Sequence, residues 1–216
     1  MTDDQQFNLL PINFFQLSLD LQRVDSQSFT SLGKRLAHDK YRLPNFSHLC
    51  GESEFAEVFL GWSPEGIATH VLVHETFKRA SYPDVTRGDS IELFIDTRDV
   101  KTSGFNTRFC HHFFCLPEEV DGYQVGELTH FRTEDAHEWC NKDDLQVKAS
   151  LHSGSYSITL LIPSHCLVGY DPDNFKRIGF AYRINRTIGP PQHFCAVTQE
   201  FQIEQQPSLW STMQLV

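Results

Sequence analysis

The chain has 216 residues, with 18 Lys and Arg against 28 Asp and Glu, which gives a formal net charge of −10. That acidic balance gives no reason to expect nucleic acid or an anionic membrane surface as a partner. Asp3 and Asp4 stand where a secretory signal would be basic, and no uninterrupted apolar run reaches the ~20 residues that span a bilayer. We therefore expect a cytoplasmic protein with one sizeable core.

Six cysteines are scattered along the chain, at positions 50, 110, 115, 140, 166 and 195. No export signal accompanies them, and 18 Phe and three Trp supply ample apolar area for a core without cross-links. We expect the cysteines to be buried, reduced thiols.

The first 50 residues are the most irregular part of the chain. Apolar and polar residues alternate at the end of residues 7–21, which predicts a strand there. Residues 22–50 are polar and weakly patterned, with a turn signal at residues 31–35, and they predict a loop-rich extension with one short helix. We expect residues 1–50 to pack as an extension on a domain formed by residues 51–216.

From residue 55 onward the pattern is that of short strands separated by turns. Residues 55–62 and 67–75 flank a Pro/Gly turn and predict a hairpin; residues 145–151 and 156–162 flank His-Ser-Gly-Ser and predict another. The remaining predicted strands are residues 88–96, 106–116, 123–131, 177–185, 194–201 and 210–216, with a polar loop around Trp139 at residues 133–144. Because helical periodicity is almost absent, we predict an all-β fold, an antiparallel β-sandwich.

The most strongly alternating strand runs from Gly88 to Asp96. Its apolar residues at positions 91, 93 and 95 share one face, whereas Glu92 and Asp96 share the other. Carboxylates are rarely buried in a hydrophobic core, so we expect the face that carries Glu92 to contact water or a ligand.

That strand reads Gly-Asp-Ser-Ile-Glu-Leu-Phe-Ile-Asp and resembles a strand of family 9 carbohydrate-binding modules and their DOMON-like relatives. Three further segments follow in that family's order: the Ile-Pro end of residues 156–163, the Ile-Gly-Phe of residues 178–180, and Trp210 before the last strand. The resemblance covers roughly residues 55–216. It implies a β-sandwich that, where family members bind sugar, holds the sugar between two aromatic rings and surrounds it with polar side chains.

The resemblance also implies a set of ligand-contacting residues. The family's glutamate, arginine and asparagine fall on Glu92, Arg108 and Asn185. A carboxylate, a guanidinium and an amide can together donate and accept hydrogen bonds with vicinal hydroxyls. These three residues are therefore the predicted polar part of a saccharide site.

The family's two tryptophans have no counterpart here. They would fall near Thr86 and Ile188, and neither position is aromatic. Sugar platforms depend on C–H faces lying against a ring, so another ring has to supply this contact. Four residues of neighbouring loops are candidate replacements: Tyr82, Phe105, His193 and Phe194.

The sequence does not favour a metal site or a haem site. Residues 110–115 read Cys-His-His-Phe-Phe-Cys, but on a regular strand these ligand types alternate between faces, so we expect no metal site there. Some DOMON-like relatives bind haem, yet the methionines are Met1 and Met213 and no histidine stands in a haem motif. We therefore expect no cofactor.

The sequence also carries no catalytic signature. Glu92 and Asp96 lie about 13 Å apart along a strand, farther than the ~5–9.5 Å between the paired carboxylates of glycosidases. We expect a non-catalytic module that binds a saccharide at one end of the sandwich. The alternative is a protein-interaction or structural module that has lost the sugar cleft, and an enzyme of unrecognised chemistry ranks below both.

Overall fold

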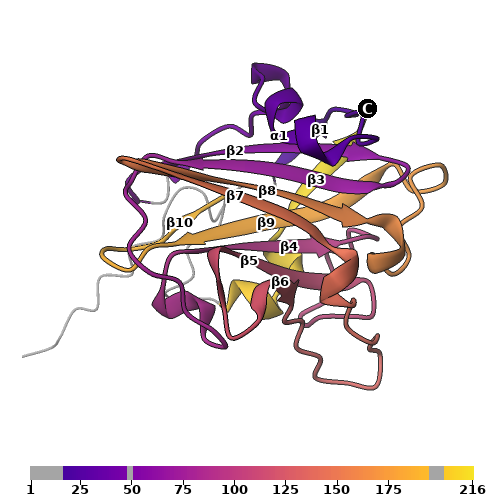
Figure 1. The fold of residues 1–216 in the computed structure, drawn as a ribbon. Helices are drawn as coiled ribbons and strands as arrows, with labels where there is room; N and C mark the ends of the chain where they lie inside the picture. The colour runs from indigo at the N-terminus through magenta and orange to yellow at the C-terminus, as the bar shows by residue number, and fades with distance from the viewer. Residues whose placement is uncertain (1–16, 48–50, 195–201) are drawn as a thin grey trace, which may run out of the picture.

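The computed structural model describes residues 17–47, 51–194 and 202–216, which form two facing β-sheets (Figure 1). The larger sheet has the strand order β1-β11-β9-β4-β5-β6, with β10 also paired to β9, and the smaller has the order β2-β3-β8-β7. The larger sheet consists of β1 (Ser18–Leu21), β4 (Ser90–Asp96), β5 (Cys110–Val120), β6 (Tyr123–Glu127), β9 (Arg177–Asn185), β10 (Gln192–His193) and β11 (Ser211–Leu215). The smaller consists of β2 (Ala56–Ser63), β3 (Gly66–Val73), β7 (Gln146–His152) and β8 (Ser155–Pro163).

The predicted antiparallel sandwich is confirmed, with one parallel pair inside it. β1 pairs parallel to β11, while the other strand pairs of the described residues are antiparallel. Both predicted hairpins are present, as β2–β3 and β7–β8. The predicted strand at residues 194–201 lies almost wholly outside the described residues.

Two predicted strands are shorter than expected. Residues 106–109 form no strand, because Cys110 N donates to Thr107 O in a turn and the Asn106 amide donates to the carbonyls of His130 and Glu204. Likewise β6 ends at Glu127 rather than at residue 131. Both changes place irregular chain beside the start of β5.

The helix expected in residues 22–50 is α1 (Phe29–Leu36), which lies on the outer side of the smaller sheet (Figure 1). The prediction of a turn at residues 31–35 is wrong, since these residues are helical. Leu32 and Leu36 lie one turn apart and are fully buried, so packing on the sheet outweighs the helix-weakening effect of Gly33. The division into residues 1–50 and 51–216 stays a prediction.

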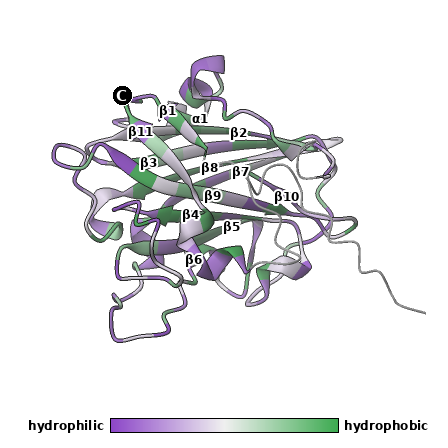
Figure 2. Ribbon diagram, turned by 180° about the vertical axis from the view of Figure 1, so that it is seen from behind, coloured by the Kyte–Doolittle hydropathy of each residue, from purple (hydrophilic) through white to green (hydrophobic). Residues whose placement is uncertain are grey.

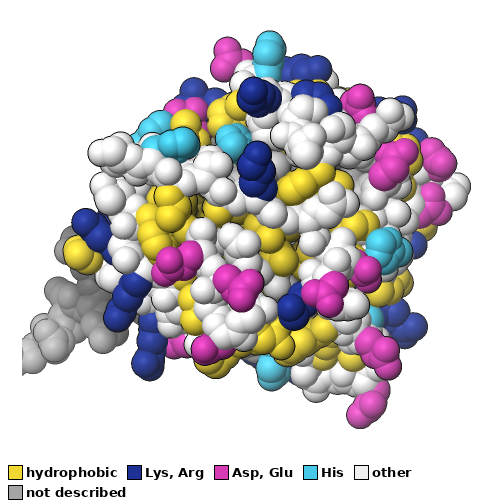
Figure 3. All heavy atoms as spheres, viewed as in Figure 1, with side chains coloured by type: hydrophobic (Ala, Val, Ile, Leu, Met, Phe, Trp, Pro, Cys, Tyr) yellow, Lys and Arg dark blue, Asp and Glu magenta, His cyan; other side chains and the backbone are white. Residues whose placement is uncertain are grey.

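Short 3₁₀ turns connect the remaining elements. They are η2 (Asp39–Tyr41), η4 (Val85–Arg87), η5 (Lys142–Asp144), η6 (Ser164–Cys166), η7 (Ile203–Gln205) and η8 (Pro207–Leu209). The strands are the more hydrophobic parts of the ribbon and the peripheral loops the more hydrophilic (Figure 2). Acidic and basic side chains are interspersed on the face shown in Figure 3. Within the described ranges, no helix has the length and apolar character needed to span a bilayer.

The main core lies between the sheets, and it includes Ile91, Leu93 and Ile95 of β4 as the alternation predicts. The expectation that the opposite face of β4 meets water is wrong, because Glu92 and Asp96 are each 1% exposed. Part of the cover comes from the chain just before β11, where Trp210 packs on Phe94 with ring centroids 5.9 Å apart. The outer face of the larger sheet is therefore a second, partly polar interior.

The cysteines are not all reduced, which corrects the sequence-based expectation. Cys110 and Cys115 are free and buried, as expected, whereas Cys140 and Cys166 form a disulfide. The pairing is non-local: the loop that follows β6 brings Cys140 against η6, 26 residues away in sequence. Cys50 and Cys195 lie outside the described residues.

Candidate ligand-binding site

Glu92 lies at the centre of a closed hydrogen-bond network on the outer face of the larger sheet. Its Oε1 accepts hydrogen bonds from His112 Nε2 at 2.9 Å and Arg183 Nη2 at 2.8 Å. Its Oε2 accepts from Arg183 Nε and Asn185 Nδ2, each at 2.6 Å. The fork of Arg183 thus binds both carboxylate oxygens, and together the four bonds occupy the acceptor sites of the carboxylate.

The network keeps Glu92 ionised inside the protein. Burial alone would raise the pKa of its carboxyl, but the hydrogen bonds from His112 and Arg183 outweigh burial and hold that pKa well below its usual range. The negative charge is balanced by a guanidinium whose side chain is only 12% exposed. Glu92 therefore fixes the positions of its neighbours and presents no open carboxylate at the surface.

The structure brings together two of the three polar residues predicted from the resemblance. Asn185 contacts Glu92 and also donates to Ser90 Oγ at 2.9 Å. Arg108 does not join them: it precedes β5 near the end where Cys110 pairs with Asp96, and its side chain bonds Asp135. That end lies about 13 Å along the strand from Glu92.

Arg183, which was not among the predicted site residues, supplies the guanidinium that Arg108 does not. It stands directly opposite Glu92 in the β4–β9 pairing. The signal was available, because Arg183 lies two residues before Asn185 and therefore on the same face of the same strand.

Of the candidate aromatic replacements, Tyr82 lies beside this network. Its ring stacks on Tyr123 with centroids 4.3 Å apart and an interplanar angle of 14°, and on Phe114 at 5.6 Å. Phe114 is the cross-strand neighbour of Glu92 and so shares its face. A Cβ atom at Gly126 would lie 2.8 Å from the Phe114 ring, so the glycine leaves the space that this ring occupies.

The other three candidates lie elsewhere. Phe105 is 39% exposed and precedes β5 at the Arg108 end. His193 is buried and its Nδ1 bonds Glu52 at 2.5 Å. Phe194 is fully buried in the main core. A ligand at the surface can reach Tyr82 and Phe105 but not the side chain of Phe194.

An open groove adjoins the stacked rings at the β6 edge of the larger sheet. Its volume is about 280 Å³, and it is lined by Tyr82, Tyr123, Phe114 and Trp139, with Asn141 and Lys142 among its polar residues. Trp139 is 56% exposed, although its indole N–H donates to Thr129 O at 2.9 Å. The sequence predicts a loop around Trp139 and no role for that residue, yet a tryptophan in an otherwise polar loop is a signal of a binding surface.

Glu127 fastens the loop that carries Trp139. Its Oε2 accepts from Cys140 N at 2.8 Å, and its Oε1 accepts from Thr129 Oγ1 at 2.6 Å. Oε1 also faces His111 Nδ1 at 3.0 Å and His137 Nε2 at 2.8 Å. Burial would raise the pKa of Glu127, but the hydrogen bonds from His111 and His137 outweigh it and lower the pKa to about 2.

This cluster is better explained by hydrogen bonding than by a metal ion. The ligand-type atoms of His111, Glu127 and His137 do lie within 4.8 Å of one another. However, Val168 N donates to His111 Nε2 at 3.0 Å, which places the ring proton on Nδ1, the atom that faces Glu127. His111 therefore donates to the carboxylate and has no lone pair directed at a metal. Residues 110–115 alternate between faces as predicted, with Cys110 on the outer face and Cys115 in the main core.

Comparison with known proteins identifies the fold. No protein-family model matches the chain, and no curated protein matches it. A family 9 carbohydrate-binding module from Caldicellulosiruptor kristjanssonii in complex with cellotriose has a TM-score of 0.65 and 14% identity over 92% of this chain and 93% of that one. The same kind of module with glucose gives 0.63 and 14% over 93% and 95%. A candidate carbohydrate-binding protein from Bacteroides uniformis gives 0.61 and 11% over 93% and 99%. The predicted resemblance is confirmed at the level of the fold: this chain has the β-sandwich of family 9 carbohydrate-binding modules.

Proposed function

We propose that this chain is a non-catalytic saccharide-binding module and that the aromatic groove at the β6 edge holds the sugar. The structures that share its fold include carbohydrate-binding modules in complex with cellotriose and glucose. The observation that carries the proposal is the exposed Trp139, which lines an open groove together with the stacked pair Tyr82 and Tyr123.

The groove offers the two kinds of contact that a sugar needs. The C–H faces of a pyranose ring bind to aromatic faces, and the exposed Trp139 provides such a face beside the stacked tyrosines. Asn141 and Lys142 provide an amide and an ammonium for hydroxyl groups. Pockets of this kind, mostly apolar with a few polar groups, are typical of small-ligand sites.

The role proposed for Glu92 and Asn185 follows from their burial. Glu92 accepts four hydrogen bonds from protein groups and has no acceptor site left for a sugar hydroxyl. Its cross-strand neighbour Phe114 forms part of the groove. We therefore assign Glu92, Asn185 and Arg183 the role of positioning the sheet face next to the groove, and Tyr82 the role of a contact residue.

The test is an NMR titration of the protein with glucose and cello-oligosaccharides. We expect saturable shifts in wild type and, in Trp139→Ala and Tyr123→Ala, a loss of affinity of about tenfold, since a stacked aromatic contact contributes ~0.5–1.5 kcal/mol and the area it buries adds to this. Phe105→Ala is the matched control, because Phe105 is also an exposed ring but lies at the Arg108 end. Arg108→Ala should likewise leave affinity unchanged.

The opposite pattern would identify the site predicted from the resemblance. If Arg108→Ala and Phe105→Ala abolish binding while Trp139→Ala does not, the sugar lies at the Arg108 end and the groove is not the site. If no sugar binds at millimolar concentration, the alternative of a protein-interaction module is favoured. The closed network around Glu92 and the non-aromatic Ile188, which is 72% exposed, are consistent with that alternative.

A further inference from the structure

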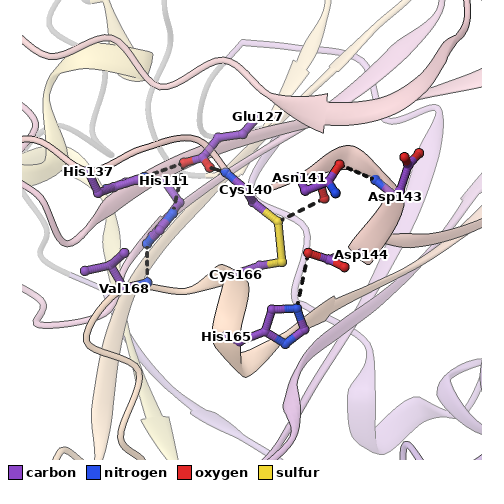
Figure 4. The surroundings of a disulfide bond; sticks show 10 residues. All are labelled: His111, Glu127, His137, Cys140, Asn141, Asp143, Asp144, His165, Cys166 and Val168. Carbon is purple, nitrogen blue, oxygen red and sulfur yellow. Dashed lines mark hydrogen bonds and ion pairs between the residues drawn. A yellow bond between two sulfur atoms is a disulfide. The ribbon is translucent and has the colours of Figure 1, made fainter.

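Two short 3₁₀ turns bring four ligand-type side chains to one place at the surface. Asp144 ends the turn η5 and Cys140 lies two residues before that turn, while the turn η6 supplies His165 and Cys166. The two sulfur atoms and a carboxylate oxygen of Asp144 all lie within 4.8 Å of one another. His165 Nε2 lies 3.5 Å from Asp144 Oδ2, so the imidazole adjoins the same group (Figure 4).

We propose that, when the Cys140–Cys166 disulfide is reduced, these four side chains form a zinc site. Two thiolates, an imidazole and a carboxylate are all zinc ligands, and four ligands are the usual number in a structural zinc site. The donor set contains two soft sulfur atoms, which favours Zn²⁺ over Mg²⁺ or Ca²⁺.

A tetrahedral ion requires the His165 ring to move towards the sulfur atoms, because His165 lies outside the group of three residues whose ligand atoms are within 4.8 Å of one another. Asp144 and His165 need to move little relative to each other. Bonds of about 2.0–2.1 Å from zinc to nitrogen and oxygen place those two atoms ~3.3 Å apart. The Asp144–His165 separation of 3.5 Å is already close to that value. The sulfur atoms must separate to ~3.8 Å, which only the reduced pair can do.

Two of the four ligands are open to solvent, whereas Cys166 is buried and Cys140 partly buried. The side chains of Asp144 and His165 are 46% and 65% exposed, so an ion can enter from solvent. Asp143, on the same turn as Asp144, points away from the sulfur atoms (Figure 4). The other described thiols do not compete, because burial raises the pKa of Cys110 and of Cys115 to about 12 and keeps both protonated.

The conversion between the disulfide and the zinc-bound dithiolate is balanced in atoms and electrons. A dithiol reductant transfers two electrons and two protons to the disulfide, the S–S bond breaks, and the reductant becomes a disulfide. Zinc binding then displaces the protons of Cys140 and Cys166 into solvent, and the two S–H bonds are replaced by two Zn–S bonds. Oxidation by a disulfide reverses both steps and releases the ion.

The experiment compares metal binding by the full-length protein in its oxidised and phosphine-reduced forms. Co²⁺ serves as the spectroscopic probe and Zn²⁺ as the competitor, with stoichiometry measured by elemental analysis. We expect one ion per reduced chain, a thiolate-to-cobalt charge-transfer band that Zn²⁺ removes, and no such band for the oxidised chain.

Matched variants locate the ion. Asp144→Asn and His165→Ala leave the disulfide intact for folding, and each should weaken zinc binding by at least the ~10–100-fold that even an outer-shell partner contributes. Asp143→Asn changes the exposed acid next to Asp144, and His152→Ala changes an exposed histidine outside the proposed site. Neither should change zinc affinity. Cys50→Ser/Cys195→Ser should also bind normally, since neither residue belongs to the proposed site.

Three results would overturn the proposal. The first is a reduced wild-type chain that binds no zinc. The second is zinc binding that survives in Cys140→Ser/Cys166→Ser, and the third is binding that is equally strong in the Asp144 and His165 variants. Because sugar binding is measured separately, failure of this site leaves the proposed function untouched, and the reverse also holds.

Discussion

At the scale of single residues, Glu92 shows how a buried carboxylate is retained. Removing its charge leaves the largely buried Arg183 guanidinium with only the more distant carboxylate of Glu204, 3.5 Å from Nη1, and removing one partner is the costly way to break such a pair. We expect Glu92→Gln to lower the free energy of unfolding by about 3 kcal/mol, measured by urea denaturation.

The control for this change is Glu118→Gln, at an exposed position near the end of β5. It should change stability by no more than ~0.5 kcal/mol. An equally small effect in Glu92→Gln would mean that the network around Glu92 does not contribute to the folded state.

Glu92 also shows what the sequence can and cannot predict for a single residue. Alternation correctly separates Glu92 from Ile91 and Leu93, because the period of a strand is a local property. It does not say which face is covered, since the cover comes from Arg183 and Trp210, which are far away in sequence. For the same reason, Arg183 and not Arg108 meets the carboxylate.

At the scale of elements, helix α1 packs close to the smaller sheet because Gly33 has no side chain at the contact. A Cβ atom at Gly33 would lie 2.6 Å from Thr159 Oγ1 and 3.2 Å from His70 Nδ1, atoms that are hydrogen-bonded to each other at 2.9 Å. Alanine would add ~1 kcal/mol of helix propensity, but overpacking costs ~1–3 kcal/mol. We expect Gly33→Ala to destabilise the protein by about 1 kcal/mol in thermal unfolding.

A second variant, Thr159→Ala, tests whether the close contact with Thr159 Oγ1 causes this destabilisation. In Thr159→Ala the obstructing oxygen is gone, so Gly33→Ala should become neutral or stabilising there. Lys34→Ala, on the exposed side of the helix, should be close to neutral in either background. Stabilisation by Gly33→Ala in wild type would show that the helix can move away from the sheet at no cost.

The strands were predicted better than the surfaces between them. Hairpins such as β2–β3 follow from alternation and a local turn, and both signals are contained in about 20 contiguous residues. The aromatic groove combines Tyr82, Phe114, Tyr123 and Trp139, which come from four separate segments. No local pattern determines that these rings meet, although the resemblance did direct attention to Tyr82.

At the scale of the whole molecule, the disulfide closes a loop of 26 residues. Loop-closure entropy for this length corresponds to about 3.5 kcal/mol, so reduction should lower Tm by roughly 7–14 °C for a protein of this size. Calorimetry with and without a phosphine reductant measures the shift. Cys140→Ser/Cys166→Ser should unfold at the reduced temperature and should not respond to reductant, and an unchanged wild-type Tm would contradict the expectation.

The parallel pairing of β1 with β11 also has a mechanical consequence. Ser18 pairs with Thr212 and Leu21 with Leu215, so the two strands point the same way and their leading and trailing ends lie at opposite ends of the pair. A pull applied through residues 18 and 215 therefore runs along the strands and loads every hydrogen bond between them at once. The pair is therefore loaded in shear, and its hydrogen bonds cannot break one after another. Such an arrangement resists mechanical unfolding, and it links the first and last strands of the described fold.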